Sequence, residues 1–246
     1  MFHYRGLKDY VLNRPFRGLL ARCDHVIAHN PQAAERLREL LGVDPMVVYD
    51  PVPQYRGELR PYAGLKPGGY LLLPVSWEPD EPVSVFVEGY YRSVLPRSGI
   101  KLVVTGDYRR RMREYKRAIR AARDAGMLVF TGYVDYDRYL WLVKNSLAVS
   151  ALTTWEYTVL SVIWEAVAYD RPLAYSDLPA LRDLVGSDGY PYDPGDPESI
   201  AAALDRLWED SARGRLELVG RRLAGRLRML SAESVERLRS ACLGEV

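Results

Sequence analysis

Cysteine, histidine and long apolar runs are scarce in this sequence, and each shortage excludes a class of protein. Two cysteines, Cys23 and Cys242, lie far apart among 246 residues, which favours reduced thiols in a cytosolic protein over a disulfide. The three histidines all fall within the first 29 residues, so we expect no metal site. Charged residues interrupt every apolar run well before about eighteen residues, and the N-terminus has no uninterrupted apolar core. We therefore expect neither a membrane-spanning helix nor a signal peptide.

Net charge is also small. Lysine and arginine number 34 and the acids 32, giving a formal charge of +2, which is too little to indicate a nucleic-acid partner. Arginine far outnumbers lysine, whereas asparagine and glutamine are scarce, which we interpret as a sign of a thermophilic or GC-rich source. The 48% hydrophobic and 27% charged residues are ordinary for a globular protein.

The chain divides into three predicted parts. Residues 1–55 indicate a small N-terminal α/β segment, in which Asn30 caps a helix that ends at Gly42, followed by a linker rich in proline and glycine. Residues 65–210 alternate strands and helices, which predicts a doubly wound parallel sheet. Residues 211–246 form a helical, arginine-rich tail. The predicted strands of the central part are 70–76, 100–106, 127–132, 147–152 and 172–176, and its predicted helices are 82–95, 109–125, 135–145, 158–169, 178–185 and 197–209.

The loops that follow the strands are the expected place for a ligand, because open parallel sheets bind ligands outside the carboxyl ends of their strands. The first of these loops, "SWEPDEP" at 76–82, has no glycine and three acids, which excludes a dinucleotide fingerprint there. The sequence also contains no P-loop motif. An anion site must therefore lie elsewhere along this edge.

Three threonines, Thr153, Thr154 and Thr158, surround the start of the apolar helix predicted over 158–169. Hydroxyl groups and the free N–H groups of a helix start together favour a phosphate. The alternative is that Thr154 or Thr158 only caps the helix. Both interpretations stay open on the sequence.

Glu165 is the carboxylate in the middle of that apolar helix. Burying a carboxylate costs on the order of several kcal/mol unless the group is paired or solvated. One interpretation is a structural ion pair with Arg171 or Arg182. The other is that Glu165 faces a cleft and accepts hydrogen bonds from two adjacent ligand hydroxyls, such as those of a ribose.

The stretch "WEAVAYDRP" at 164–172, with Glu156 nine residues before Glu165, resembles the paired glutamates and "EA-A-G-P" pattern of glycosyltransferase family 4, which has the GT-B fold. The order of strands and helices over 65–210 fits the family's C-terminal donor domain. Residues 23–40 resemble the last strand and helix of its N-terminal domain. The resemblance implies a Rossmann-like donor domain with a truncated N-terminal domain.

The resemblance also implies roles for individual residues. Glu165 is expected to bind the ribose, the amides around Thr158, Val159 and Leu160 the diphosphate, and the loop at Gly132, Tyr133 and Val134 the base. Glu156 or Asp80 is expected to contact the sugar as the catalytic group. Further expected donor-binding residues are Thr154, Tyr157, Ser76, Trp77, Gly106 and Arg109.

Two departures from the family pattern shape these expectations. The family spaces its glutamates by eight residues, so Tyr157 holds the strict first position. The family's Gly-Arg and Lys after the first strand are absent, and residues 76–81 instead resemble the "SW-x-x-DE" segment of dolichol-linked β-mannosyltransferases and related prokaryotic enzymes. Phosphate stabilisation would then rest on the helix dipole, hydroxyls and Arg109 or Arg110.

The implied activity is transfer of a sugar from a nucleotide-diphosphate sugar to a glycan or lipid-linked acceptor, without metal or cofactor. Because residues 1–55 resemble only the end of an acceptor domain, we expect a partner protein or a second copy of the chain to complete the enzyme. The alternative is a non-catalytic nucleotide-sugar-binding or scaffold subunit that partners a separate transferase.

Two basic stretches bear on location. Residues 107–126 read as a solvated helix face, with contact to acidic lipid or phosphate as the alternative. The tail over 211–243 places leucines at helical spacing with arginines opposite, and either packs onto the N-terminal segment or lies on an anionic membrane. We expect a cytoplasmic protein, at the inner membrane surface in the second case, with no nucleic-acid partner.

Overall fold

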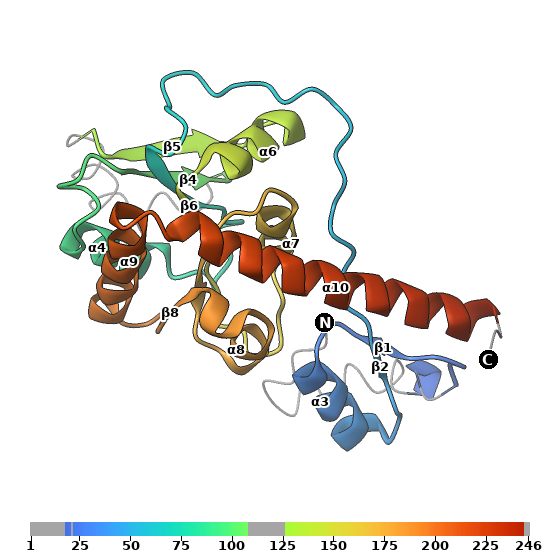
Figure 1. The fold of residues 1–246 in the computed structure, drawn as a ribbon. Helices are drawn as coiled ribbons and strands as arrows, with labels where there is room; N and C mark the ends of the chain where they lie inside the picture. The colour runs from blue at the N-terminus through green and yellow to red at the C-terminus, as the bar shows by residue number, and fades with distance from the viewer. Residues whose placement is uncertain (1–17, 21, 108–125, 244–246) are drawn as a thin grey trace. The chain divides into compact units, whose positions relative to one another are not determined.

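A computed structural model describes residues 18–20, 22–107 and 126–243 of the chain (Figure 1). It forms two compact units: Met1–Asp50 with Ser231–Val246, and Pro51–Leu230. The helix predicted over 109–125 and the predicted donor-binding Arg109 lie outside the described residues. No helix in the described ranges has both the length and the apolarity needed to cross a bilayer.

The larger unit is built on a six-stranded sheet in which all neighbouring strands are parallel. The order β5-β4-β3-β6-β7-β8 means that the chain winds outward from β3, returns, and winds outward from β6 on the other side (Figure 1). Every residue of β3, β6 and β7 is buried, which explains their continuous apolar sequences. The predicted doubly wound α/β sheet is confirmed. Its strands are β3 (Tyr70–Leu73), β4 (Lys101–Thr105), β5 (Leu128–Gly132), β6 (Ala148–Ala151), β7 (Leu173–Ser176) and β8 (Tyr190–Tyr192).

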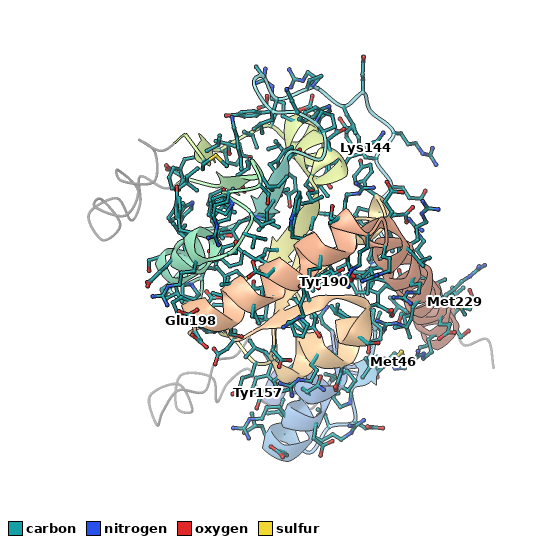
Figure 2. All side chains as sticks on the ribbon, turned by 60° about the vertical axis from the view of Figure 1, so that its left-hand side comes forward. Met46, Lys144, Tyr157, Tyr190, Glu198 and Met229 are labelled. Carbon is teal, nitrogen blue, oxygen red and sulfur yellow. The ribbon has the colours of Figure 1, made fainter. Side chains whose placement is uncertain are left out.

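The helices of this unit agree with the predicted ones, apart from their ends. Two of them, α4 (Val83–Arg92) and α9 (Pro197–Ala212), pack closely at Gly89, where a Cβ atom would lie 2.6 Å from Ile200. Arg92 of α4 bonds to Glu198, which Figure 2 labels at the start of α9. The helices are α4 (Val83–Arg92), α6 (Tyr136–Asn145), α7 (Ser161–Ala168), α8 (Pro179–Val185), α9 (Pro197–Ala212) and α10 (Leu216–Leu243), which continues into the smaller unit.

The smaller unit contains two short parallel strands, β1 (Ile27–Ala28) and β2 (Met46–Val47), and the helix α3 (Pro31–Leu41). The side chain of Asn30 accepts a hydrogen bond from the Ala33 N–H at 2.8 Å, and Gly42 ends the helix with a left-handed φ of 66°, as predicted. Within the same unit, Arg237 of α10 donates to the carbonyl of Val47 at 3.5 Å. This contact agrees with a tail that packs onto the N-terminal segment.

The segment 51–69, predicted as a linker, has no helix or strand and belongs to the larger unit. Arg60 fastens it to the start of α6 by bonds to Asp135 and Asp137. The ring of Tyr55 meets that of Tyr136 edge-on, with 5.8 Å between their centroids. The segment is thus held against the edge of the sheet where the strands end.

Candidate functional site

A cleft of about 530 Å³ opens at the carboxyl ends of β3 and β4, beside the point where the strand order reverses. Open α/β sheets bind ligands in this crevice, because adjacent loops diverge there to opposite faces. Its walls come from the loops after β3, β4 and β5, from α6 and from the start of α7. The lining residues are Pro74, Val75, Ser76, Glu81, Thr105, Gly106, Asp107, Tyr133, Val134, Tyr136, Tyr139, Leu160, Ser161, Val162 and Glu165.

Glu165 projects from α7 into this cleft and has no ion-pair partner among the described residues. Its Oε2 atom accepts a hydrogen bond from the phenol of Tyr139. Burial raises the pKa of the Glu165 carboxyl, and the Tyr139 hydrogen bond opposes that rise. The alternative of a structural ion pair is wrong: Arg171 donates to the carbonyls of Tyr169 and Ser146, and Arg182 pairs with Asp177.

The start of α7, where the sequence predicts an anion site, lies three residues later than predicted. The helix begins at Ser161 after an extended Leu160, because β-branched Thr158 and Val159 are poor helix formers. Its N-cap residue is Leu160, whose apolar side chain cannot cap it, and not Thr154 or Thr158. The first N–H groups of a helix have no intrahelical acceptor and attract anions.

Among the residues predicted to bind the diphosphate, Leu160 lines the cleft together with the unpredicted Ser161 and Val162. Thr158, Val159 and Tyr157 do not line it. Thr154 also stays outside, and its N–H and hydroxyl both donate to the Asp80 carbonyl.

The carboxylates predicted to contact the sugar are not in the cleft. Asp80 is buried, and its Oδ2 accepts a hydrogen bond from the Thr153 hydroxyl at 2.7 Å, so it ties the loop after β3 to the loop after β6. Glu156 is exposed on the loop before α7. The cleft instead contains Glu81 and Asp107, which the sequence analysis did not select.

Glu81 organises the loop after β3. Its carboxylate accepts hydrogen bonds from the N–H groups of Ser76, at 2.9 and 3.1 Å, and Glu78, at 2.9 Å. Between them Trp77 has a left-handed φ of 63°, and its Nε1 donates to the Thr105 carbonyl at 3.0 Å. Trp77, one of the expected donor-binding residues, is only 3% exposed and does not line the cleft.

Glycine is required at Gly106, next to this loop. Its φ is 83°, and a Cβ atom there would lie 2.1 Å from the carbonyl oxygen of Val75. The N–H of Gly106 donates to the carbonyl of Gly132, which also has a left-handed φ, of 69°. These two predicted glycines shape the end of β4 and β5, and Gly106 itself lines the cleft.

Tyrosines form the rim on the α6 side. Tyr133, a predicted residue, is 88% exposed at the mouth of the cleft. Tyr136 and Tyr139, which the sequence analysis missed, stack on α6 with 6.3 Å between ring centroids. Their spacing of three residues on a predicted helix was the available signal, because such residues share one helix face.

The described lining thus combines acidic side chains with backbone N–H groups. Glu81, Asp107 and Glu165 contribute carboxylates, and none of the described lining residues is lysine, arginine or histidine. No group of three or more potential metal ligands occurs in the described part of the chain. Such a surface accepts hydrogen bonds from ligand hydroxyls along one wall and stabilises an anion at the start of α7.

Comparisons with known proteins agree with this geometry. The family model described as "Glycosyl transferases group 1" matches residues 74–210, which include the whole lining of the cleft. No curated protein matches the chain.

Solved structures share the fold at low sequence identity. Anabaena HepE, solved with UDP and glucose, is 16% identical and has a TM-score of 0.72 over 92% of this chain and 66% of its own. Sucrose-phosphate synthase from Thermosynechococcus elongatus is 18% identical, with a TM-score of 0.72 over 100% and 65%. The pneumococcal O-GlcNAc transferase GtfA, solved with UDP and GlcNAc, is 15% identical, with a TM-score of 0.69 over 93% and 46%. The chain therefore spans about two thirds or less of each of these structures.

Proposed function

Because this chain belongs to the glycosyl transferases group 1 family, we propose that it transfers a sugar from a nucleotide-diphosphate sugar to an acceptor. The observation that carries the proposal is Glu165, a carboxylate that faces a cleft beside the first N–H groups of α7 and has no ion pair with any residue that the structure describes. That HepE and GtfA were solved with UDP and a sugar supports a nucleotide-sugar donor.

In this proposal, Glu165 accepts hydrogen bonds from the ribose hydroxyls. Its Oε2 already accepts one from Tyr139, and each carboxylate oxygen has two acceptor positions. The N–H groups at Ser161 and Val162 hold the diphosphate and stabilise the charge that develops on it when the sugar leaves. Each charge-assisted contact contributes about 1.5–3 kcal/mol.

The remaining ligand groups follow from this placement. The base lies towards Tyr133 and Val134, and the sugar towards Glu81 and Asp107, whose carboxylates accept its hydroxyls. Arg109 follows Asp107 by two residues and is proposed to add a positive charge near the diphosphate. The donor is proposed to need neither metal nor cofactor.

The acceptor side is proposed to come from elsewhere. Neither Asp80 nor Glu156 lines the cleft, so we propose that the group that acts on the acceptor belongs to a partner protein or a second copy of the chain. The acceptor is proposed to be a glycan or a lipid-linked sugar, used on the cytoplasmic side of the membrane. A non-catalytic nucleotide-sugar-binding subunit is the second candidate, favoured by the lack of a cation among the described lining residues.

Calorimetric titration with UDP, GDP, ADP and their sugars tests the proposal. The wild type is expected to bind at least one nucleoside diphosphate, and Glu165→Ala is expected to weaken that binding about 10- to 100-fold through the lost hydroxyl contacts. Glu156→Ala is the matched control, because this glutamate is exposed and outside the cleft.

Equal losses in Glu165→Ala and Glu156→Ala, or no binding of any nucleotide at about millimolar concentration, would contradict the proposed ribose contact. Release or transfer of the sugar from the bound donor then distinguishes an enzyme from the non-catalytic candidate.

A further inference from the structure

The loop after β3 gathers its backbone N–H groups around one point. Ser76, Trp77 and Glu78 are consecutive. The N–H groups of Ser76 and Glu78 donate to the Glu81 carboxylate, and the N–H of Trp77 between them also lowers the pKa of that carboxyl. Successive N–H groups that converge in this way form a concave anion-binding nest. We call residues 76–78 the β3 nest.

The β3 nest depends on an uncommon backbone conformation. Trp77 adopts a φ of 63°, which non-glycine residues rarely do, and this turn aims neighbouring N–H groups to one side. The indole is locked by its bond to the Thr105 carbonyl and by Gly106, where a Cβ atom would lie 3.0 Å from the ring. The nest is therefore held open by the surrounding structure and not by Glu81 alone.

The β3 nest faces the cleft that the candidate ligand would occupy. Ser76 and Glu81 both line it, on the same wall as Gly106 and Asp107. A nest of this kind beside a ligand cleft would ordinarily receive an anionic group of the ligand, and here the chain's own carboxylate fills it. Asp80 does not compete for the nest, because it bonds to Thr153.

We propose that Glu81 is an internal anion that occupies the β3 nest, so that this wall of the cleft excludes phosphate and accepts ligand hydroxyls. The start of α7 then remains as the anion site among the described residues. The first part of the inference stands on the loop geometry, and the assignment of the hydroxyls to a donor sugar rests on the proposed function. Glu81 is a positioning and specificity residue in this scheme.

Chemical rescue of Glu81→Ala tests the inference without any nucleotide. Removing the carboxylate is expected to lower the midpoint of thermal unfolding by about 5–10 °C, because the part-buried N–H groups of Ser76 and Glu78 lose their acceptor. Formate or inorganic phosphate is expected to restore part of this loss by entering the empty nest, relative to chloride at equal ionic strength. The wild type is expected to gain less from either anion.

Two variants control the experiment. Glu81→Gln fills the nest with a neutral amide, so it is expected to lose stability without rescue by formate. Glu78→Ala keeps its backbone N–H and removes only an exposed side chain, so it is expected to behave as the wild type. Where Glu81→Ala does not fold alone, the yield of soluble protein on refolding with formate, compared with Glu81→Gln, gives the same readout.

A second measurement connects the nest to ligand choice. Glu81→Ala is expected to bind inorganic phosphate at least about tenfold more tightly than the wild type. Equal stabilisation of Glu81→Ala and the wild type by both anions, or equal rescue of Glu81→Gln, would overturn the inference. These measurements use no nucleotide, so they can contradict the inference about Glu81 while the proposed function holds. They can equally support that inference while the proposed function fails.

Discussion

The hydrogen bond from Tyr139 to Glu165 sets the charge of the cleft, and Tyr139→Phe tests this. Burial raises the pKa of the Glu165 carboxyl, whereas the Tyr139 phenol lowers it by stabilising the ionised form. Phenylalanine keeps the ring that stacks on Tyr136 and removes only the donor. A hydrogen bond to a charged group contributes about 1.5–3 kcal/mol. The pKa of Glu165 is therefore expected to rise further in Tyr139→Phe, and partial exposure of the carboxyl to solvent moderates the rise.

The pH dependence of ligand binding is the assay. A ribose that donates to Glu165 needs the ionised carboxylate, so nucleoside diphosphate binding is expected to strengthen as pH rises through the Glu165 pKa. In Tyr139→Phe this strengthening is expected at higher pH than in the wild type, while binding well above the Glu165 pKa approaches the wild-type value. Tyr133→Phe is the control, because its exposed phenol lies on the cleft rim away from the Glu165 bond.

For Glu165, the pH dependence of folding stability is opposite in sign to the pH dependence of ligand binding. A carboxyl whose folded pKa lies above its unfolded value stabilises the fold below the unfolded pKa, and this contribution is lost as pH rises through the folded pKa. Tyr139→Phe extends that loss to higher pH. Coincident pH profiles of binding and unfolding in Tyr139→Phe and the wild type would refute the assigned role of this hydrogen bond.

Three further predictions concern the walls of the cleft. Gly106→Ala is expected to reduce the free energy of unfolding by about 3 kcal/mol or more, because its φ is 83° and the added Cβ meets Val75. Gly225→Ala is the control, because Gly225 lies in an open and exposed part of α10, and it is expected to raise the free energy of unfolding by about 0.5–1 kcal/mol. Denaturant titration measures both variants, and a similar loss of unfolding free energy in both would contradict the steric argument. Thr153→Val is expected to destabilise by about 1–3 kcal/mol, because it leaves the buried Asp80 carboxylate without its hydroxyl donor, while nucleotide affinity of the folded protein stays near the wild-type value. Added salt tests whether the described carboxylates and amides form the whole site. If they do, nucleotide binding is expected to change little or to strengthen, because salt screens the repulsion between like charges. A steep weakening of binding in calorimetry would show that cations such as Arg109 contact the diphosphate.

The sheet could be predicted from sequence because its strands are buried on both faces. Runs such as "YLLL" and "LAVSA" allow no amphipathic helix, and their regular alternation with helices leaves a parallel sheet as the simplest arrangement. Glu165 could also be selected from the sequence, because a single acid in an apolar helix must be solvated, paired with a cation or bonded to a ligand.

The choice between Asp80 and Glu81 could not be made from the sequence. The two acids are adjacent, and their directions depend on the left-handed turn at Trp77 and on a hydroxyl at Thr153, 73 residues away. The start of α7 was likewise misplaced by three residues, because Thr158 and Val159 fit an apolar helix by pattern but prefer extended backbone. Tyr139 was one of 18 tyrosines, and only the packing of α6 against α7 selects it.

The energetics of Glu165 and Glu81 explain why both acids are assigned to recognition. Burial raises the pKa of each carboxyl, so at neutral pH each ionised group disfavours the fold. Glu81 offsets this cost with hydrogen bonds from the N–H groups of Ser76 and Glu78, which hold the wall of the cleft in shape. Within the described ranges, Glu165 accepts a hydrogen bond only from the phenol of Tyr139, which leaves acceptor positions open towards the cleft. A group that is costly to bury and incompletely bonded by its own chain gains its missing contacts when a ligand with paired hydroxyls binds, which is why Glu165 carries the proposed donor recognition.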